Sequence, residues 1–346
     1  MANDGPAGAA PRLRVLESFG SPRETTNPHS VLLLNALRRD ADVDTFTWRR
    51  ALTGRYDVFH VHWPEVVVTK DTAPRRLAAC VLLATALVGF RLKRTAIVRT
   101  AHNMAPHEDK DAVTRAVLRL TNRWTTWWIR LNDATPTPAG VPATTIPLGD
   151  YGDWYAAHAS GGPDAGRLLF FGLIRPYKDV PNLVRRFAGT VDPDLRLVVA
   201  GKPSSPEVET AVRTAAAGDD RVELLLGHVP DADLAAAIGA AQLVALPYRE
   251  MHNSGAVLLA LTLGRPVLVP ANAVTDAVAH EVGAWWVQRY DGDLTAEQLT
   301  DALARTAGVP PTPADLSGRS WDRLAQRHLR VFRDAVDRVR GRRRRG

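Results

Sequence analysis

Cysteine is almost absent from this sequence of 346 residues. Its single cysteine, Cys80, cannot form a disulfide within the chain, and such a count is typical of proteins that work in a reducing compartment. No apolar run or cleavage pattern follows the first residue, so we expect residues 1–11 to be a disordered leader and the protein to stay in the cytoplasm. A small secreted fold built on disulfides is excluded.

Patterns for binding metal are lacking as well, because no group of histidine, cysteine and aspartate has metal-ligand spacing along the sequence. His60 and His62 stand on one predicted strand. We expect their side chains to point to opposite faces and to make a poor metal pair. We therefore predict that the protein binds no metal.

A long hydrophobic run is also missing. The apolar run at residues 77–90 has fourteen residues with basic residues at both ends, whereas a membrane span needs about 20. The run is either a buried helix or a helix lying in the lipid interface, and the next predicted helix favours the second alternative. That helix and its end combine basic side chains on one stripe with tryptophans: Arg115, Arg119, Arg123, Trp124, Trp127 and Trp128.

Acidic residues are fewer than basic ones, 37 against 44. Six of the basic residues lie in a tail at residues 338–346, and without them 38 basic residues remain against 37 acidic ones. A second excess lies in residues 75–130, with eleven basic residues and three acids. We expect an anionic membrane surface as partner, with peripheral attachment to the inner face of the plasma membrane. Nucleic acid is not expected, because no nucleic-acid motif accompanies the charge.

What the sequence does contain is a regular alternation of apolar strands and helices, which indicates parallel βαβ units. The alternation stops at a glycine- and proline-rich stretch and then starts again. We predict an α/β protein of two doubly wound, Rossmann-like domains with a ligand in the cleft between them. The predicted parts are a first domain (12–155), a linker (156–166), a second domain with a C-terminal helix (167–337) and a basic tail (338–346).

Ligands of parallel sheets bind beyond the carboxyl ends of the strands, so polar residues there are candidates for binding. In the second half, "NSGAVLLALTLG" opens a helix whose free N–H groups and dipole attract phosphate. "GLIRPYKDV" adds Arg175 and Lys178, whose positive charges suit a diphosphate. We expect a nucleotide-diphosphate site. Its candidate residues are Gly172, Arg175, Lys178, His228, Tyr248, Asn253, Ser254 and Gly255.

Four segments within roughly residues 168–287 carry a family resemblance: "FFGLIRPYKDVPNLVRRF", "LVVAGKP", "LLLGHVPDADLAAAIGAAQLVALPY" and "SGAVLLALTLGRPVLVP". In this order they resemble the donor domain of GT-B glycosyltransferases, and "NPHSVLLLNAL", "YDVFHVHWPE" and "VRTAHNMAPHE" fit the first domain. The pattern is most similar to bacterial exopolysaccharide glycosyltransferases, including the GDP-mannose:glycolipid β-mannosyltransferase type. The resemblance implies transfer of a hexose, such as mannose, from a GDP- or UDP-linked sugar. That nucleotide sugar is a co-substrate, no further cofactor is implied, and the acceptor is a glycolipid or polysaccharide.

An acid is absent where the resemblance would place one. Retaining GT-B enzymes of the large family 4 type carry Glu-x7-Glu here, and the aligned positions are Met251 and Leu259, with Glu250 beside the first. We therefore expect an inverting, metal-independent transfer in which a base of the first domain removes the proton of the acceptor hydroxyl. The candidate bases are Glu108, which we favour, Glu65 and His102.

Two other functions are compatible with this sequence. A nucleotide-sugar epimerase of the same fold would act on free nucleotide sugar and would have no use for a lipid-facing basic helix. A non-catalytic relative that binds nucleotide sugar or glycan is the other alternative, because the glutamate pair is missing. Transfer from a set of nucleotide sugars, with and without a polyprenol-linked acceptor, distinguishes the three.

Overall fold

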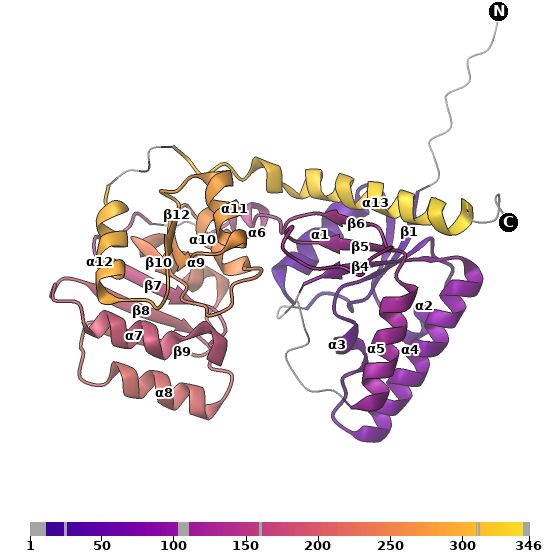
Figure 1. Ribbon diagram of the computed structural model, residues 1–346, viewed down its shortest axis with the longest axis horizontal. Coiled ribbons are helices and arrows are strands. Elements are labelled where there is room, and N and C mark those ends of the chain that lie inside the picture. The colour runs from indigo at the N-terminus through magenta and orange to yellow at the C-terminus, as the bar shows by residue number, and fades with distance from the viewer. Residues whose placement is uncertain are drawn as a thin grey trace, which may run out of the picture. The chain divides into compact units, whose positions relative to one another are not determined.

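The computed structural model describes residues 12–23, 26–102, 111–158, 161–308, 310 and 312–341. The chain divides into two compact units, unit 1 (Met1–Pro147 and Trp321–Gly346) and unit 2 (Leu148–Ser320). Each unit contains a six-stranded sheet with helices packed on it (Figure 1). The predicted α/β class with two doubly wound domains is confirmed.

The sheet of unit 1 is parallel throughout, in the order β2-β1-β3-β4-β5-β6. The strand order reverses between β1 and β3, which is where such sheets bind ligands. Its strands are β1 (Arg14–Glu17), β2 (Asp42–Asp44), β3 (Val58–Val61), β4 (Ala96–Ala101), β5 (Trp127–Arg130) and β6 (Ala143–Thr145). Its helices are α1 (Pro28–Arg38), α2 (Trp48–Thr53), α3 (Pro64–Val68), α4 (Ala73–Lys93), α5 (Ala112–Trp124) and α13 (Trp321–Gly341).

Helices cover both faces of this sheet. On one face the side chains of Phe59 and Ile97 pack against Leu83, Leu87 and Phe90 of α4, and α2, α3 and α5 surround that helix. On the other face α13 contacts α1 and β4, and Figure 1 shows α13 in yellow along this side of the unit. All four residues of β3 are buried, as expected for a central strand of a parallel sheet.

Unit 2 has the strand order β12-β11-β10-β7-β8-β9, also parallel. Relative to the chain this is the order of a Rossmann dinucleotide-binding sheet, with its reversal between β7 and β10. The strands are β7 (Arg167–Phe171), β8 (Arg196–Gly201), β9 (Val222–Leu226), β10 (Leu243–Ala245), β11 (Val267–Pro270) and β12 (Val287–Tyr290). The helices are α6 (Gly152–Tyr155), η1 (Pro176–Lys178), α7 (Val180–Ala188), α8 (Pro206–Ala216), α9 (Asp231–Ala240), α10 (Gly255–Thr262), α11 (Ala273–Val282), α12 (Ala296–Arg305) and η2 (Ser317–Arg319).

The structure corrects the predicted domain boundaries. The C-terminal helix α13 belongs to unit 1, because its apolar face is buried there and the ring of Phe332 lies 5.0 Å from that of His60. The first boundary falls after Pro147 rather than at a linker over residues 156–166. Tyr151 N–H already donates to Thr262 Oγ1 (3.2 Å) inside unit 2. Residues 1–11 lie outside the described residues, and of the predicted tail only 338–341, the end of α13, is described.

The expected group of tryptophans is also different. Trp124 ends α5, but Trp127 and Trp128 belong to strand β5, and the Trp128 side chain is buried with the Arg99 guanidinium 4.8 Å from its ring. The helix period therefore does not continue through the tryptophans. Of the six residues, the three arginines lie exposed along α5, together with Ala112, Val113 and Ala116.

Helix α4, with 21 residues, is longer than the apolar run read from the sequence. Within the described part of the chain it is one helix that could cross a membrane by length and composition, and a core helix can meet the same test. Its buried residues pack into the core of unit 1. Its other side exposes a stripe of apolar residues, hereafter the α4 stripe: Leu77, Val81, Val88 and Leu92.

Candidate functional site

The carboxyl edge of the unit 1 sheet holds a buried cluster of one carboxylate and five imidazoles. Glu17 is the last residue of β1 and is paired in register with His60 of β3, while His62 and His102 follow β3 and β4. The other two members come from the helices on one face of the sheet. They are His29 in the first turn of α1, which Asn27 caps, and His328 in the middle of α13.

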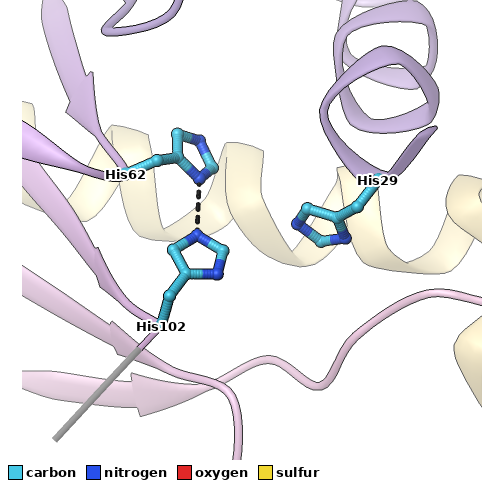
Figure 2. A group of neighbouring side chains, drawn as sticks. All are labelled: His29, His62 and His102. Carbon is cyan, nitrogen blue, oxygen red and sulfur yellow. Dashed lines mark hydrogen bonds between the residues drawn. The ribbon is translucent and has the colours of Figure 1, made fainter. Parts of the chain in front are cut away.

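Hydrogen bonds link four of these groups, Glu17, His60, His62 and His102, into one chain. The two oxygens of Glu17 lie 3.0 Å from His60 Nδ1 and 3.1 Å from His62 Nε2. His62 Nδ1 is in turn 2.9 Å from His102 Nε2, and Figure 2 shows these two rings facing each other with His29 beside them. A continuous path therefore runs from a fully buried carboxylate to an imidazole at the end of β4.

Burial and proximity set the protonation states of the cluster. Burial raises the pKa of Glu17, but His60 and His62 outweigh it through charge and hydrogen bonds and lower that pKa to about 2. Burial, followed by the charge of His60, lowers the pKa of His62 to about 4. Burial likewise lowers the pKa of His29 to about 3 and holds that of His102 well below its usual value. At neutral pH the carboxylate is charged and these three imidazoles are neutral.

The expectation that His60 and His62 point to opposite faces is wrong. Residues two apart along a strand project from the same face, and the two rings lie 4.2 Å apart beside Glu17. Two groups in this part of the structure have ligand atoms within 4.8 Å of one another and could hold a metal ion, namely Glu17/His60/His62 and His29/His62/His102. The sequence spacing concealed both groups, since their members come from separate elements.

In the His29/His62/His102 group, two rings are hydrogen-bonded to each other and the ring of His29 packs against them edge-on. The nitrogens of His62 and His102 that would face a metal bond each other instead. Nδ1 of His29 is buried and has no hydrogen-bond partner among the described residues. The composition would suit a metal such as zinc, whereas the geometry is that of a chain of imidazoles oriented by Glu17.

A cavity of about 400 Å³ lies beside the cluster within unit 1. The Trp63 ring stacks on His102 with 4.1 Å between centroids, and Phe19 meets His62 edge-on. Other aromatic walls of the cavity come from Phe46 and Trp48. Aromatic faces of this kind offer apolar surface for a ring-shaped ligand, so a substrate bound here would approach the end of the histidine chain.

A second set of polar groups lies in unit 2, beyond β7 and β10. The Lys178 ammonium is 4.8 Å from the Tyr248 ring, and Ser254 caps α10 by accepting from Val257 N–H. A Cβ on Gly255 would lie 2.6 Å from Tyr151 Oη, so only glycine fits this contact. The loop after β7 starts at Gly172, whose φ of +99° suits glycine.

Arg175 and Lys178 are two cations of this set that lie close together, while the neighbouring Asp179 pairs with Arg249 (2.8 Å). Burial, followed by the nearby charge of Arg175, lowers the pKa of Lys178 to about 8. Two cations that disfavour each other at the amino end of a helix are stabilised by an anion bound between them. These groups lie at the strand-order reversal of a Rossmann sheet, where such sheets receive ligands.

Comparisons with known proteins fit both units. The family described as "Glycosyl transferases group 1" matches residues 165–305. Two proteins of Xanthomonas campestris pv. campestris, each named "GDP-mannose:glycolipid 4-beta-D-mannosyltransferase", are 43% identical over 332 residues, which is 95% of this chain and 95% of theirs. The chain is a group 1 glycosyltransferase.

Solved structures show the GT-B fold of this glycosyltransferase. AviGT4, described as a glycosyltransferase involved in avilamycin A biosynthesis, superposes with a TM-score of 0.59 at 16% identity, covering 94% of this chain and 98% of that one. The catalytic domain of starch synthase IV from Arabidopsis thaliana, bound to ADP and acarbose, has a TM-score of 0.64 at 11% identity, covering 94% and 100%. At these identities the likeness concerns the fold alone.

The predicted donor residues of the glycosyltransferase gather at the strand ends of unit 2. Gly172, Arg175 and Lys178 follow β7, and the residues from Tyr248 to Gly255 follow β10, the neighbouring strand. His228 is exposed after β9 at the sheet edge. Met251 and Leu259, which stand where retaining enzymes have glutamates, are both buried apolar side chains, while Glu250 is exposed.

Of the three predicted catalytic residues, the structure describes Glu65 and His102. Glu108 lies outside the described residues. Glu65 is half-buried in the first turn of α3, where its charge partly offsets the lowering of the Arg99 pKa by burial. His102 is in the cluster. Sequence reasoning missed Glu17, and its only signal was an acid ending an otherwise apolar strand.

We expect acid to destabilise the glycosyltransferase through its buried histidines. Burial lowers the folded pKa of His328 to about 3 and that of His62 to about 4, against 6.5 in the unfolded chain. The unfolded state therefore binds more protons between these values, so stability is full above 6.5 and falls as the pH drops. Each such histidine contributes about 1.4 kcal/mol per pH unit. Calorimetric unfolding from about pH 7 to about pH 4 measures this slope.

His328→Gln should flatten the slope, whatever its effect on stability at neutral pH. His280→Gln, which changes an exposed histidine, serves as control and should leave the slope unchanged. Equal slopes for wild type and His328→Gln would show that burial does not lower this pKa.

Proposed function

We propose that this glycosyltransferase transfers a mannosyl group from GDP-mannose to a glycolipid acceptor, with inversion at the anomeric carbon and without a metal ion. The observation that carries the proposal is the 43% identity, over 95% of the chain, to proteins named for GDP-mannose, a glycolipid and a β linkage. Group 1 membership supports nucleotide-sugar transfer in general. The residues of the two units then suggest how the chemistry is divided.

Unit 2 would hold the donor. Within the described part of the chain, neither Arg175 nor Lys178 forms an ion pair with a carboxylate, and the neighbouring Asp179 pairs with Arg249. The diphosphate of a nucleotide sugar would supply the negative charge, and the first turn of α10 adds backbone N–H groups. When the sugar leaves, the charge that develops on the diphosphate is met by groups already in place. Side-chain cations would therefore do here what a bound divalent ion does in other transferases.

The apolar pair Met251 and Leu259 favours inversion. Neither side chain can hydrogen-bond the nucleotide ribose or a sugar in the way a glutamate can. A single displacement needs no group on this helix beyond the phosphate contacts. It needs only a base that deprotonates the acceptor hydroxyl as that oxygen attacks the anomeric carbon.

Unit 1 would supply the base. Glu108 and Glu65 are carboxylate candidates, and His102 is the candidate that a hydrogen-bonded chain supports. His62 links His102 to Glu17, in the way that a carboxylate orients the imidazole of a hydrolytic triad. Burial lowers the pKa of His102, so this imidazole is neutral at neutral pH but weakly basic, and the chain to Glu17 would stabilise the proton that it accepts during the attack.

A lipid-anchored acceptor would explain why unit 1 exposes apolar and basic side chains next to each other. The α4 stripe is apolar and exposed, with 51–80% of Leu77, Val81 and Leu92 accessible to solvent, and α5 carries exposed Arg115 and Arg119. Apolar and basic side chains together suit the interface of an anionic membrane. The enzyme would thus bind the inner face of the plasma membrane, where a glycolipid acceptor is anchored.

Loss of the cation pair should abolish donor binding. Each charge-assisted contact contributes about 1.5–3 kcal/mol, or roughly ten- to hundredfold in affinity, so Arg175→Ala with Lys178→Ala should lower GDP affinity by at least about a hundredfold in calorimetry. Affinity in the wild type should also weaken above about pH 8, where Lys178 loses its proton. Arg185→Ala with Arg186→Ala, exposed on α7, is the matched control. Unchanged GDP affinity in the first double variant would falsify the donor site.

The product should carry a β-mannosyl linkage, which one-bond carbon–proton coupling at the anomeric carbon reports. An α linkage would refute inversion. The same assay ranks the bases, since replacing the base should lower kcat by about a hundredfold or more. Glu17→Gln should lower kcat and shift its pH profile if His102 is the base, and should leave the profile in place if Glu65 or Glu108 is.

Attachment to membrane should depend on unit 1. Val81→Asp with Val88→Asp places two charges on the α4 stripe, and Arg115→Glu with Arg119→Glu reverses the charge of α5. Both double variants should float at least about tenfold less with phosphatidylglycerol liposomes at low salt, since each basic residue near such a surface contributes about 1 kcal/mol. Val191→Asp, at a 96% exposed apolar residue of unit 2, is the control. Flotation unaffected by either change would rule out this surface, and loss only in a chain ending at Gly341 would assign attachment to the tail.

A further inference from the structure

A second cavity in unit 1, hereafter the arginine pocket, lies at the amino edge of the sheet, opposite the histidine cluster. Residues that precede β4, β5 and β6 line it, together with the ends of α4, α5 and α13. Its volume is about 380 Å³, enough for a phosphate with a small organic group. Four of its lining residues are arginines: Arg91, Arg94, Arg123 and Arg338.

The charges of the arginine pocket are uncompensated. No carboxylate lines it, and none of the four arginines forms an ion pair within the described part of the chain. Other arginines of unit 1 do find partners, since Arg76 pairs with Asp111 and Arg340 pairs with Asp57. Four guanidinium groups that converge on one cavity repel one another, and an anion within it would reverse that effect.

The backbone conformation of Arg94 is one that normally favours glycine, so the arginine side chain at this position calls for an explanation. Arg94 is the C-cap of α4 and adopts the left-handed conformation, with φ of 57°. Glycine is the usual residue at such a helix end, because a side chain costs about 1 kcal/mol in this region. The chain places a guanidinium there instead, and Arg94 lines the pocket.

The pocket also contains the hydroxyls of Thr95, Thr125 and Thr126, of which the first two already donate to the backbone carbonyls of Tyr56 and Thr121. Arg91 lies over the Trp124 ring, 5.6 Å from its centroid, and this fixes its position. Thr126 Oγ1 accepts from Ile97 N–H at 3.3 Å, so its own proton remains available to a ligand. Guanidinium groups bind phosphate oxygens in pairs, and the pocket offers several such groups without a competing acid.

We propose that the arginine pocket binds a phosphate monoester or diester. The site goes beyond the proposed transfer, because it lies at the edge of the sheet away from Glu17 and the histidines. Two sources share this chemistry, a phospholipid headgroup and a free phosphate ester. Leu92, which is 80% exposed and follows Arg91 on α4, continues the α4 stripe up to the pocket, so a headgroup bound there would leave its acyl chains beside apolar side chains.

The test compares the full-length wild type with an Arg94→Gly, Arg338→Gln double variant. Glycine adopts the backbone conformation of Arg94 without strain, so the melting temperature should not fall at this position and loss of binding is separable from loss of fold. Calorimetry with sn-glycerol 3-phosphate should show affinity reduced about tenfold or more in the variant. Since the donor residues of unit 2 are unchanged, the difference between the two proteins reports the arginine pocket alone.

A second arm uses liposomes of phosphatidylglycerol and of phosphatidylcholine. Binding that depends on the pocket in the liposome arm alone identifies a lipid headgroup, and binding that depends on it in the soluble arm identifies a free phosphate ester. Either result supports the proposal. Arg333→Gln, an exposed arginine on the same helix α13, is the control for loss of one charge and should behave as wild type in both arms. If wild type and the double variant are equal in both arms, the pocket is not a phosphate site.

Discussion

The buried carboxylate of Glu17 constrains the whole carboxyl edge of unit 1. A charge with no exposure to solvent is tolerated only when hydrogen bonds replace the water it has lost. His60 and His62 provide those bonds, and they can do so only if β1 and β3 keep the register that sets Glu17 beside His60. His102 and the helices α1 and α13 are then packed around rings whose orientation is already fixed. Breaking such a buried pair by removing one partner costs about 3–5 kcal/mol.

The two units use opposite electrostatic arrangements. Unit 1 surrounds a buried anion with imidazoles whose lowered pKa keeps them neutral at neutral pH, so its strand ends present neutral nitrogen acceptors next to one carboxylate. Unit 2 sets Arg175 and Lys178 together, and among the residues that the structure describes neither is paired with a carboxylate, since Asp179 pairs with Arg249. Its strand ends are therefore suited to receive negative charge. A displacement reaction needs both arrangements: neutral acceptors where the acceptor hydroxyl loses its proton, and cations where the diphosphate departs.

The sequence predicted the fold more fully than the site. Alternation of strands and helices was enough for two parallel sheets, and the loops after β7 and β10 could be placed together because ligands bind at strand ends. Glu17 could not be recognised, since its partners are 43 and 45 residues away along the chain and only folding brings them into contact. The prediction that His60 and His62 face opposite sides of the strand misapplied the two-residue period. The prediction that the three tryptophans share a helix failed because α5 ends at Trp124 and strand β5 begins at Trp127. Glu65 and Glu108 were chosen by position after a strand, a criterion that does not show what a side chain contacts.

Helix α13 links the two ends of the chain. Its residues Leu329, Phe332 and Val336 complete the core of a unit whose other residues precede Leu148, and between the two segments the chain builds all of unit 2. During synthesis the last helix emerges only after unit 2 has been made, so the first unit to begin folding is the last to be finished. Contacts over such sequence separation are slow to form. Until they do, the face of the first sheet that carries His60 and Thr100 has no helix α13 to cover it, and a chaperone or a neighbouring chain has access to an apolar surface that the finished enzyme conceals.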